Sequence, residues 1–266
     1  MSIIFTDIDG TLYGEEKKIH KDLIGNIKEA KNASFMFNIS TGNGMFDYMK
    51  ELAYKLKAKY LITSNGACIY DVPKKKIIFE DKIDKDIANK ILFKANKMSI
   101  SSNWWDEKII FTNKYTSEEL KKQCSNSAGY NFKNIKLSKE VYNDIYKIEF
   151  ISKTEKEIKQ LIKDINFYNL QISRISKLHI EVTKNNVSKG NAVLRICKIH
   201  NVDPKTVMTI GDSGNDLSML QLTKYSYAMA NANSEVKKVA NLNAAAYNQN
   251  GLGLSIIDYI HRRKKY

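Results

Sequence analysis

The chain has 266 residues, of which 43% are hydrophobic and only two are proline, so its composition is that of a folded protein with one large or two modest cores. Its 43 Lys and Arg residues exceed its 29 Asp and Glu residues, which gives a formal net charge of +14. No run of about 18 apolar residues is present, which excludes a membrane-spanning helix. Asp7 and Asp9 interrupt the N-terminal stretch where a secretory signal would be basic and then apolar. The three cysteines show no metal-ligand spacing, so we expect a soluble, reduced, cytoplasmic protein.

The excess of lysine is one sign of a protein that binds nucleic acid or a membrane surface, because cations attract polyanions. The basic residues are instead spread along the whole chain, and only four of them are arginine. A nucleic-acid interface would gather arginine and stacking aromatic residues in one region. We therefore expect neither nucleic acid nor a membrane as a partner, and a basic polyanion binder remains the less favoured alternative.

Three short apolar runs near the start of the chain, each followed by turn residues, are predicted to be buried strands: 2–6, 35–40 and 60–63. The turn after the second run, Gly42-Asn43, is predicted to open an amphipathic helix that places Met45, Met49 and Leu56 at helical spacing. Strands that alternate with helices imply a parallel sheet with right-handed crossovers. The lysine run at 74–76 is predicted to form a hairpin turn.

The pattern changes near residue 82. Helices are predicted at 84–97 and 154–165, and strands at 109–112, 145–152, 170–175 and 178–183, which together describe a two-layer α+β unit. The first pattern then returns, with a helix that Ser188 caps and a strand at 206–210. We therefore predict a discontinuous core domain, 1–82 with 184–266, and an inserted domain at 83–183.

Four carboxylates follow strands of the predicted core: Asp7, Asp9, Asp212 and Asp216. Ligands bind beyond the carboxyl ends of the strands in an open parallel sheet, so these side chains are expected to meet in space. Clustered carboxylates repel one another, and the usual remedy is a hard divalent cation with oxygen ligands. The sequence therefore predicts a Mg²⁺ site.

Groups suited to a phosphate are expected at the same sheet edge. Thr41 offers a hydroxyl, and the Gly42-Asn43 turn offers free backbone N–H groups. Lys189 falls on the first turn of a helix, where the helix dipole does not favour a cation. An anionic ligand would explain this lysine, and an ordinary surface position is the alternative.

The apolar strand followed by Asp7-Ile8-Asp9-Gly10-Thr11-Leu12 resembles the signature of the haloacid dehalogenase-like (HAD) phosphatases. Thr41 matches the second motif of that superfamily, Lys189 matches the third, and Gly211-Asp212-Ser213-Gly214-Asn215-Asp216 matches the fourth. The insertion at 83–183 resembles the C2-type cap of the Cof-type (IIB) subfamily. Most members of that subfamily carry arginine where Asn43 stands. A smaller subset, which includes sugar-phosphate phosphatases, has asparagine at this position, and in this respect the sequence resembles that subset.

This resemblance implies an α/β fold, a doubly wound parallel-sheet Rossmann-like core with an inserted α+β cap, and a Mg²⁺-dependent phosphatase. It implies that Asp7 is the nucleophile and Asp9 the general acid and base. Mg²⁺ would be held by the Asp7 carboxylate, the Asp9 main-chain carbonyl and Asp212. Asp216 would orient water molecules bound to the metal, or Lys189, without being a direct ligand. Thr41 and Lys189 would bind the phosphoryl oxygens. The further substrate contacts that the resemblance implies are Gly42, Asn43, Asn65 and Asn215.

The expected substrate is a small phosphorylated metabolite, and the expected assembly is a monomer or weak homodimer. The cap would read the leaving group, with Trp104-Trp105 as a candidate stacking wall. Because adjacent strand residues face opposite ways, at most one of the two is expected in the pocket. A phosphosugar mutase or phosphotransferase on the same core remains an alternative, since the aspartyl-phosphate could pass to a sugar hydroxyl rather than to water.

Overall fold

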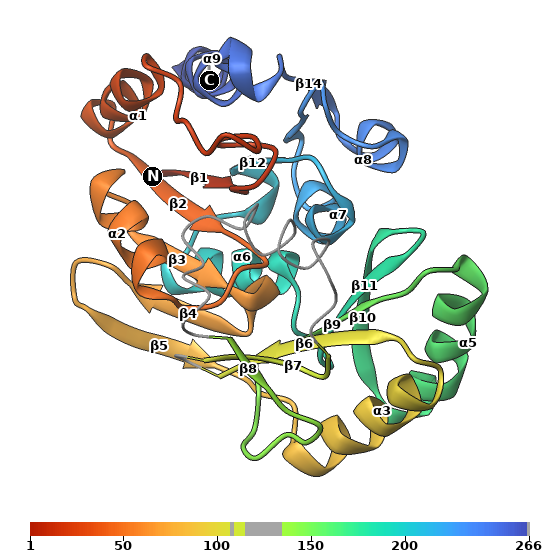
Figure 1. Cartoon of the computed structure of the whole chain (residues 1–266). Helices are drawn as coiled ribbons and strands as arrows, with labels where there is room; N and C mark the ends of the chain where they lie inside the picture. The colour runs from red at the N-terminus through yellow and green to blue at the C-terminus, as the bar shows by residue number, and fades with distance from the viewer. Residues whose placement is uncertain (107–108, 115–134, 265–266) are drawn as a thin grey trace.

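The computed structural model describes residues 1–106, 109–114 and 135–264 (Figure 1). In this part of the chain an eight-stranded sheet has the order β14-β13-β12-β1-β2-β3-β4-β5. Neighbours from β14 to β3 are parallel, and β4 and β5 add an antiparallel edge. The strands are β1 (Ser2–Thr6), β2 (Phe35–Ser40), β3 (Tyr60–Thr63), β4 (Cys68–Asp71), β5 (Lys76–Glu80), β12 (Met208–Gly211), β13 (Tyr225–Ala228) and β14 (Leu242–Asn243).

Helices cover both faces of this sheet because its parallel strands are apolar on both sides. On β1, Ile4 packs in the same core as Leu23 of α1 and Ile256 of α9. Its neighbours Ile3 and Phe5 point the other way and pack against α6. The helices are α1 (Leu23–Asn32), α2 (Asp47–Lys55), α6 (Lys189–Ile199), α7 (Leu217–Leu220), α8 (Ser234–Val239) and α9 (Gly251–Lys264).

A second sheet lies beside the carboxyl ends of the first sheet's parallel strands (Figure 1). It has the order β10-β11-β9-β6-β7-β8 and is antiparallel except between β7 and β8. Its strands are β6 (Ser101–Trp105), β7 (Ile110–Thr112), β8 (Ile135–Leu137), β9 (Lys147–Ile151), β10 (Leu170–Ser176) and β11 (His179–Lys184). Two helices, α3 (Lys85–Lys97) and α5 (Glu155–Ile165), cover one face with their apolar sides.

The two faces of the second sheet differ sharply in polarity. Trp104, Ile148 and Phe150 point to α3 and α5 and form a separate hydrophobic core. The residues that alternate with these along β6 and β9 point the other way, and among them Asn103 and Glu149 line the pocket that faces the first sheet. This alternation follows from the two-residue period of a strand. The inserted sheet therefore has one face for packing and one for a ligand.

The observed elements confirm the predicted fold class. Ser188 caps α6 through its hydroxyl, which accepts a hydrogen bond from the Asn191 amide at 3.1 Å. Lys74 and Lys75 of the lysine run lie in the β4–β5 turn, with Lys75 at a φ of 52°, and Lys76 begins β5. The division into 1–82 with 184–266 and 83–183 remains a proposal. The two sheets support it, although β11 extends one residue past 183.

Three predicted boundaries were wrong by two residues or more, one of them the start of the strand predicted at 145–152, which begins at Lys147. The helix expected to open at Gly42-Asn43 begins instead at Asp47, after the extended residue Phe46. Gly42 and Asn43 therefore lie in a loop, and that helix offers them no free N–H groups. The strand predicted at 206–210 begins at Met208, because Pro204–Thr206 forms a 3-10 turn.

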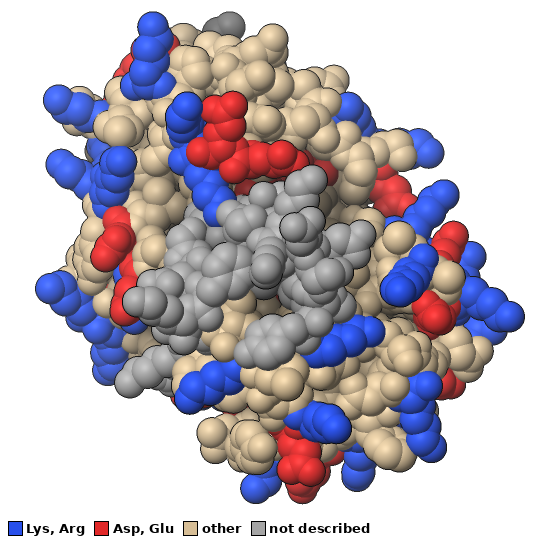
Figure 2. All heavy atoms as spheres, viewed as in Figure 1, with Lys and Arg blue, Asp and Glu red and all other residues tan. Residues whose placement is uncertain are grey.

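None of the helices that the structure describes is long and apolar enough to cross a membrane. Lys and Arg side chains lie scattered over the face shown in Figure 2, and red carboxylates gather near its upper centre. The distribution on this face agrees with the even spread of lysine along the sequence.

Candidate functional site

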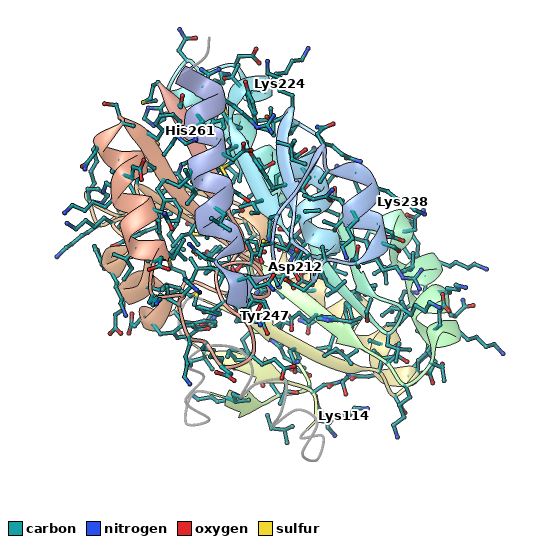
Figure 3. The ribbon with its side chains drawn as sticks, turned by 90° about the horizontal axis from the view of Figure 1, so that it is seen from above. Lys114, Asp212, Lys224, Lys238, Tyr247 and His261 are labelled. Carbon is teal, nitrogen blue, oxygen red and sulfur yellow. The ribbon has the colours of Figure 1, made fainter. Side chains whose placement is uncertain are left out.

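The ends of three neighbouring parallel strands, β12, β1 and β2, deliver the predicted acidic and hydroxyl groups to one pocket. The Asp7 amide continues the pairing of β1 by donating to the Ile210 carbonyl at 3.1 Å. Asp7, Thr41 and Asp212 all line a cavity of about 400 Å³. Figure 3 shows Asp212 where the ribbons of the two sheets meet. The sequence prediction that these distant residues converge is thus met by the geometry.

Lys189 joins two carboxylates beneath this pocket. Its ammonium is completely buried and donates to Asp7 Oδ1 and to Asp216 Oδ1, each at 2.6 Å. Burial alone would lower the pKa of Lys189, but Asp216 and Asp7 reverse that effect and raise it. The lysine is therefore a buried cation and not the surface residue that was the alternative, and its binding to an anionic ligand stays a prediction.

Asp7 and Asp212 are held close to other negative charge. Burial raises the pKa of Asp7 well above its ordinary value, against the lowering effect of Lys189. Burial, and next Asp216, raises the pKa of Asp212 to about 7. Carboxyl oxygens of Asp7, Asp212 and Asp216 lie within 4.8 Å of one another. Crowded carboxylates with raised pKa values are the donor set that a hard divalent cation would satisfy.

Within this group Asp216 already has partners for both of its oxygens. Oδ1 binds Lys189, and Oδ2 accepts from the backbone amides of Asp212 and Ser213 at 2.9 and 3.0 Å. These bonds fix the loop that carries Asp212. The geometry therefore favours Asp216 as the residue that positions Asp212 and Lys189, with Asp7 and Asp212 left to face a cation.

Asp9 points into the pocket and is held by Asn43. The Asn43 amide nitrogen donates to Asp9 Oδ2 at 2.7 Å and to Thr41 Oγ1 at 3.1 Å. Burial raises the pKa of Asp9, and the hydrogen bond from Asn43 opposes that rise. Asn43, predicted as a substrate contact, here orients the carboxyl expected to move protons. A direct contact with substrate stays a prediction.

Gly10 allows the Asp212 loop to approach the strand that carries Asp7. Its φ is +83°, and a Cβ at this position would lie 2.3 Å from Asp212 Oδ2. Any side chain would therefore displace the carboxylate and strain the backbone. Thr11 adds a hydrogen bond from Oγ1 to Asp212 Oδ1 at 3.3 Å. The Gly10-Thr11 turn thus positions Asp212.

The predicted contacts Asn65 and Asn215 meet a residue that sequence reasoning missed, Glu181 of β11. Asn65 Nδ2 donates to Glu181 Oε2 at 2.6 Å, and Asn215 Nδ2 donates to the same oxygen at 3.3 Å. Gly42 lies against all three side chains. Asn215 and Gly42 line the pocket, so their role toward substrate stays a prediction. Asn65 is engaged in joining the two sheets.

Lys147 is the second buried cation of the site, and it was also missed. It is completely buried and pairs with Glu181 and, at 2.9 Å, with Glu149. Burial alone would lower the pKa of Lys147 and raise that of Glu181. Glu149 and Glu181 nevertheless raise the pKa of Lys147, and Lys147 lowers that of Glu181 to about 2. The alternation of charged and apolar residues over 147–151 was the available sequence signal.

The tryptophan pair divides as expected. Trp105 lines the pocket, and its indole nitrogen donates to Ser64 Oγ at 3.0 Å. Trp104 points to the opposite face and stacks on Phe111 with ring centres 6.0 Å apart. One tryptophan is therefore placed beside a ligand and the other holds the sheet to its helices.

Comparison with known proteins agrees with this geometry. The sequence model of the haloacid dehalogenase-like hydrolases matches residues 4–256. Phosphatase YwpJ from Bacillus subtilis is 24% identical to this chain over 283 residues, which cover 95% of this chain and 97% of YwpJ. The 5-amino-6-(5-phospho-D-ribitylamino)uracil phosphatase YcsE from the same organism is 28% identical over 247 residues, or 90% and 88% of the two chains.

Solved structures show the same fold. The HAD subclass IIB sugar phosphatase BT4131 superposes with a TM-score of 0.82 at 22% identity, covering 97% of this chain and 99% of its own. A haloacid dehalogenase-like hydrolase from B. subtilis gives a TM-score of 0.82 at 21% identity, covering 96% and 99%.

Proposed function

This chain belongs to the haloacid dehalogenase-like hydrolases and is a phosphatase, and we propose that it hydrolyses small phosphomonoesters, preferably sugar phosphates, with Mg²⁺ and through an aspartyl-phosphate. The observation that carries the proposal is the buried Lys189, which pairs with Asp7 at the base of the pocket. A fixed cation beside a carboxylate lets that carboxylate approach a phosphate dianion, because it neutralises part of their repulsion.

In the first half-reaction an Asp7 oxygen attacks phosphorus. A bond forms between this oxygen and phosphorus as the bond from phosphorus to the leaving oxygen breaks. Asp9 gives its proton to the leaving oxygen, so the sugar departs as a neutral alcohol. The raised pKa of Asp9 suits this role, because the carboxyl must arrive protonated.

In the second half-reaction water attacks the same phosphorus. Asp9, now a carboxylate, takes a proton from the water, and the bond from phosphorus to the Asp7 oxygen breaks to release inorganic phosphate. Asn43 holds Asp9 in place through both steps. Thr41 Oγ1 accepts from Asn43 and keeps its own proton for a phosphoryl oxygen.

The carboxylates of Asp7 and Asp212 fit a magnesium ion, with the Asp9 main-chain carbonyl as the further ligand proposed. When bound, Mg²⁺ supplies Lewis acidity and alignment of the phosphoryl group with the nucleophile. Asp216 keeps its own hydrogen bonds and holds the Asp212 loop.

Affinity for Mg²⁺ is expected to fall as the pH drops below about 7. The pKa of Asp212 is about 7, so below that pH a proton occupies the carboxyl that the cation needs. When Mg²⁺ must displace one proton from Asp212, its apparent affinity falls about tenfold for each unit by which the pH is lowered. Calorimetric Mg²⁺ titrations between about pH 5.5 and pH 8 measure this slope. An affinity that does not change with pH would contradict it.

The raised pKa of Asp212 also determines how the stability of the metal-free protein changes with pH. The folded protein holds the Asp212 proton more tightly than the unfolded chain does, since the ordinary pKa is 3.8. The contribution of this group to the free energy of unfolding therefore falls as the pH rises from about 4 through about 7. Asp212→Asn should remove the contribution of Asp212 to the pH dependence of stability and to that of Mg²⁺ binding.

The sugar preference rests on Asn43, on the pocket-facing Trp105 and on the polar face of the second sheet. A panel of phosphorylated metabolites, assayed for released phosphate with Mg²⁺ and with a chelator, tests the proposal. Phosphate release from small monoesters that stops without metal is expected. Transfer to a second sugar with little free phosphate would identify a mutase. No turnover, together with salt-sensitive retention on heparin that survives Asp7→Asn, would identify a polyanion binder.

A further inference from the structure

A single row of side chains on the second sheet lines the part of the pocket that lies away from the residues proposed to bind phosphate. Asn103 of β6 lies directly opposite Glu149 of β9, and Glu149 lies directly opposite Glu181 of β11. All three line the pocket, together with His179. Directly opposed residues in antiparallel strands have neighbouring side chains on the same face. The leaving group of a bound phosphomonoester would therefore meet this row.

The row carries more negative than positive charge. Lys147 lies between Glu149 and Glu181 and binds both. Its ammonium also lies 4.6 Å from the centre of the Trp105 ring, so its charge is directed to partners within the protein. One lysine cannot balance two carboxylates, so the described set of Lys147, Glu149 and Glu181 carries one net negative charge.

Two residues that line the pocket have buried polar atoms without partners. Asn103 is only 7% exposed, and among the described residues its Oδ1 has no hydrogen-bond partner. His179 Nε2 is likewise buried and unpaired within the described part of the chain. Buried polar atoms without partners are costly, so a ligand that donates to the Asn103 oxygen and forms a hydrogen bond with His179 would relieve both. Glu149, whose side chain is 21% exposed, adds a carboxylate to the same set.

We propose that this row selects leaving groups rich in hydrogen-bond donors, namely neutral polyols and aminopolyols, and rejects leaving groups that carry a second anion. The inference rests on the proposed function and adds the feature that separates one sugar phosphate from another. A second carboxylate or phosphate would meet the Asn103 oxygen and the carboxylates of Glu149 and Glu181, and no lysine or arginine is among the described residues that line the pocket. A hydroxyl or an ammonium would donate to Asn103 and Glu149.

A metal ion is the competing occupant, because Glu149, His179 and Glu181 could each offer a ligand atom within 4.8 Å of the others. The Lys147 ammonium already occupies the space between the two carboxylates. A metal ion there would need the carboxylate oxygens of Glu149 and Glu181 that already bind Lys147. The donor-rich leaving group is therefore favoured.

Three probes that differ only at the carbon farthest from phosphate test the proposal: sorbitol 6-phosphate, 6-phosphogluconate and 1-amino-1-deoxysorbitol 6-phosphate. Their kcat/KM values are compared at about 0.15 M salt, which screens attraction by the lysine-rich surface beyond about 8 Å. We expect the polyol to exceed the acid by at least about tenfold, because like charges brought together in a binding site are strongly disfavoured. The amine should equal or exceed the polyol.

Two variants move this preference in opposite directions. Glu149→Gln should reduce the ratio of polyol to acid at least about fivefold, because it removes the excess charge. Asn103→Asp should widen the ratio and favour the amine further. Glu140→Gln removes the same charge from an exposed position of the inserted sheet's domain and should leave the ratio unchanged.

Equilibrium binding of the three probes to Asp7→Asn, measured by calorimetry, separates this inference from the proposed function. If the wild-type protein releases no phosphate, the proposed function fails, and the binding order still decides the inference. Equal binding of polyol and acid, or a ratio that neither variant changes, would overturn the role of the row.

Discussion

Asp7→Asn is expected to lower kcat by at least about 10⁴-fold, because removing the residue proposed to form the covalent intermediate leaves only binding and electrostatic assistance. The variant should fold normally. Asn has the shape of Asp, and the raised pKa of Asp7 shows that its charge is unfavourable at this buried position. Phosphate release measured over hours, with thermal unfolding measured in parallel, gives both quantities.

The matched control is Asp86→Asn, which makes the same change at an exposed position on α3. It should retain full activity. An Asp7→Asn protein with more than about 1% of wild-type turnover would show that another group is the nucleophile.

Lys189→Met is expected to lower the free energy of unfolding by about 3–5 kcal/mol in the absence of metal. The substitution leaves Asp7 and Asp216 buried without the cation that binds both. Activity should also fall by at least about 10³-fold, because the lysine stabilises charge on the phosphoryl group. Urea unfolding in a chelating buffer measures the stability, and phosphate release at saturating Mg²⁺ measures the activity.

A second substitution identifies the cause of this loss. Lys189→Met combined with Asp216→Asn removes one of the two unpaired charges, so about half of the lost stability should return while activity stays low. Lys198→Met, on the exposed side of the same helix, should change stability by no more than about 0.5 kcal/mol. A double variant no more stable than Lys189→Met would show that the lysine stem, and not its charge, supplies the stability.

Most of the core could be predicted because its strands are short apolar runs that end in turn residues. Asp7, Thr41 and Asp212 follow such runs, so the parallel arrangement alone brings them together. The start of α2 could not be predicted in this way. Met45 and Phe46 are buried like helix residues, yet they belong to the loop that brings Asn43 to Asp9.

The polar half of the site was harder to predict because its residues look ordinary in sequence. Glu181 and Lys147 are unremarkable in a chain with 72 charged residues, 43 basic and 29 acidic. Their importance arises from the register of β9 and β11, which places Glu149 opposite Glu181. Strand register depends on long-range pairing and turn geometry. A pattern of alternating residues shows only which residues of one strand lie on the same face of the sheet.

The separation of Asp7 and Lys189 by 182 positions has a consequence for how the protein is made. During synthesis Asp7 leaves the ribosome long before Lys189, and β1 pairs with β12, which begins at Met208. The inserted sheet, whose last strand ends at Lys184, is complete earlier. Domains generally fold as units during translation, and distant pairings form slowly. The nascent chain is therefore expected to complete the inserted sheet, to which we assign substrate recognition, before the strand pairing that brings Asp7 to Lys189.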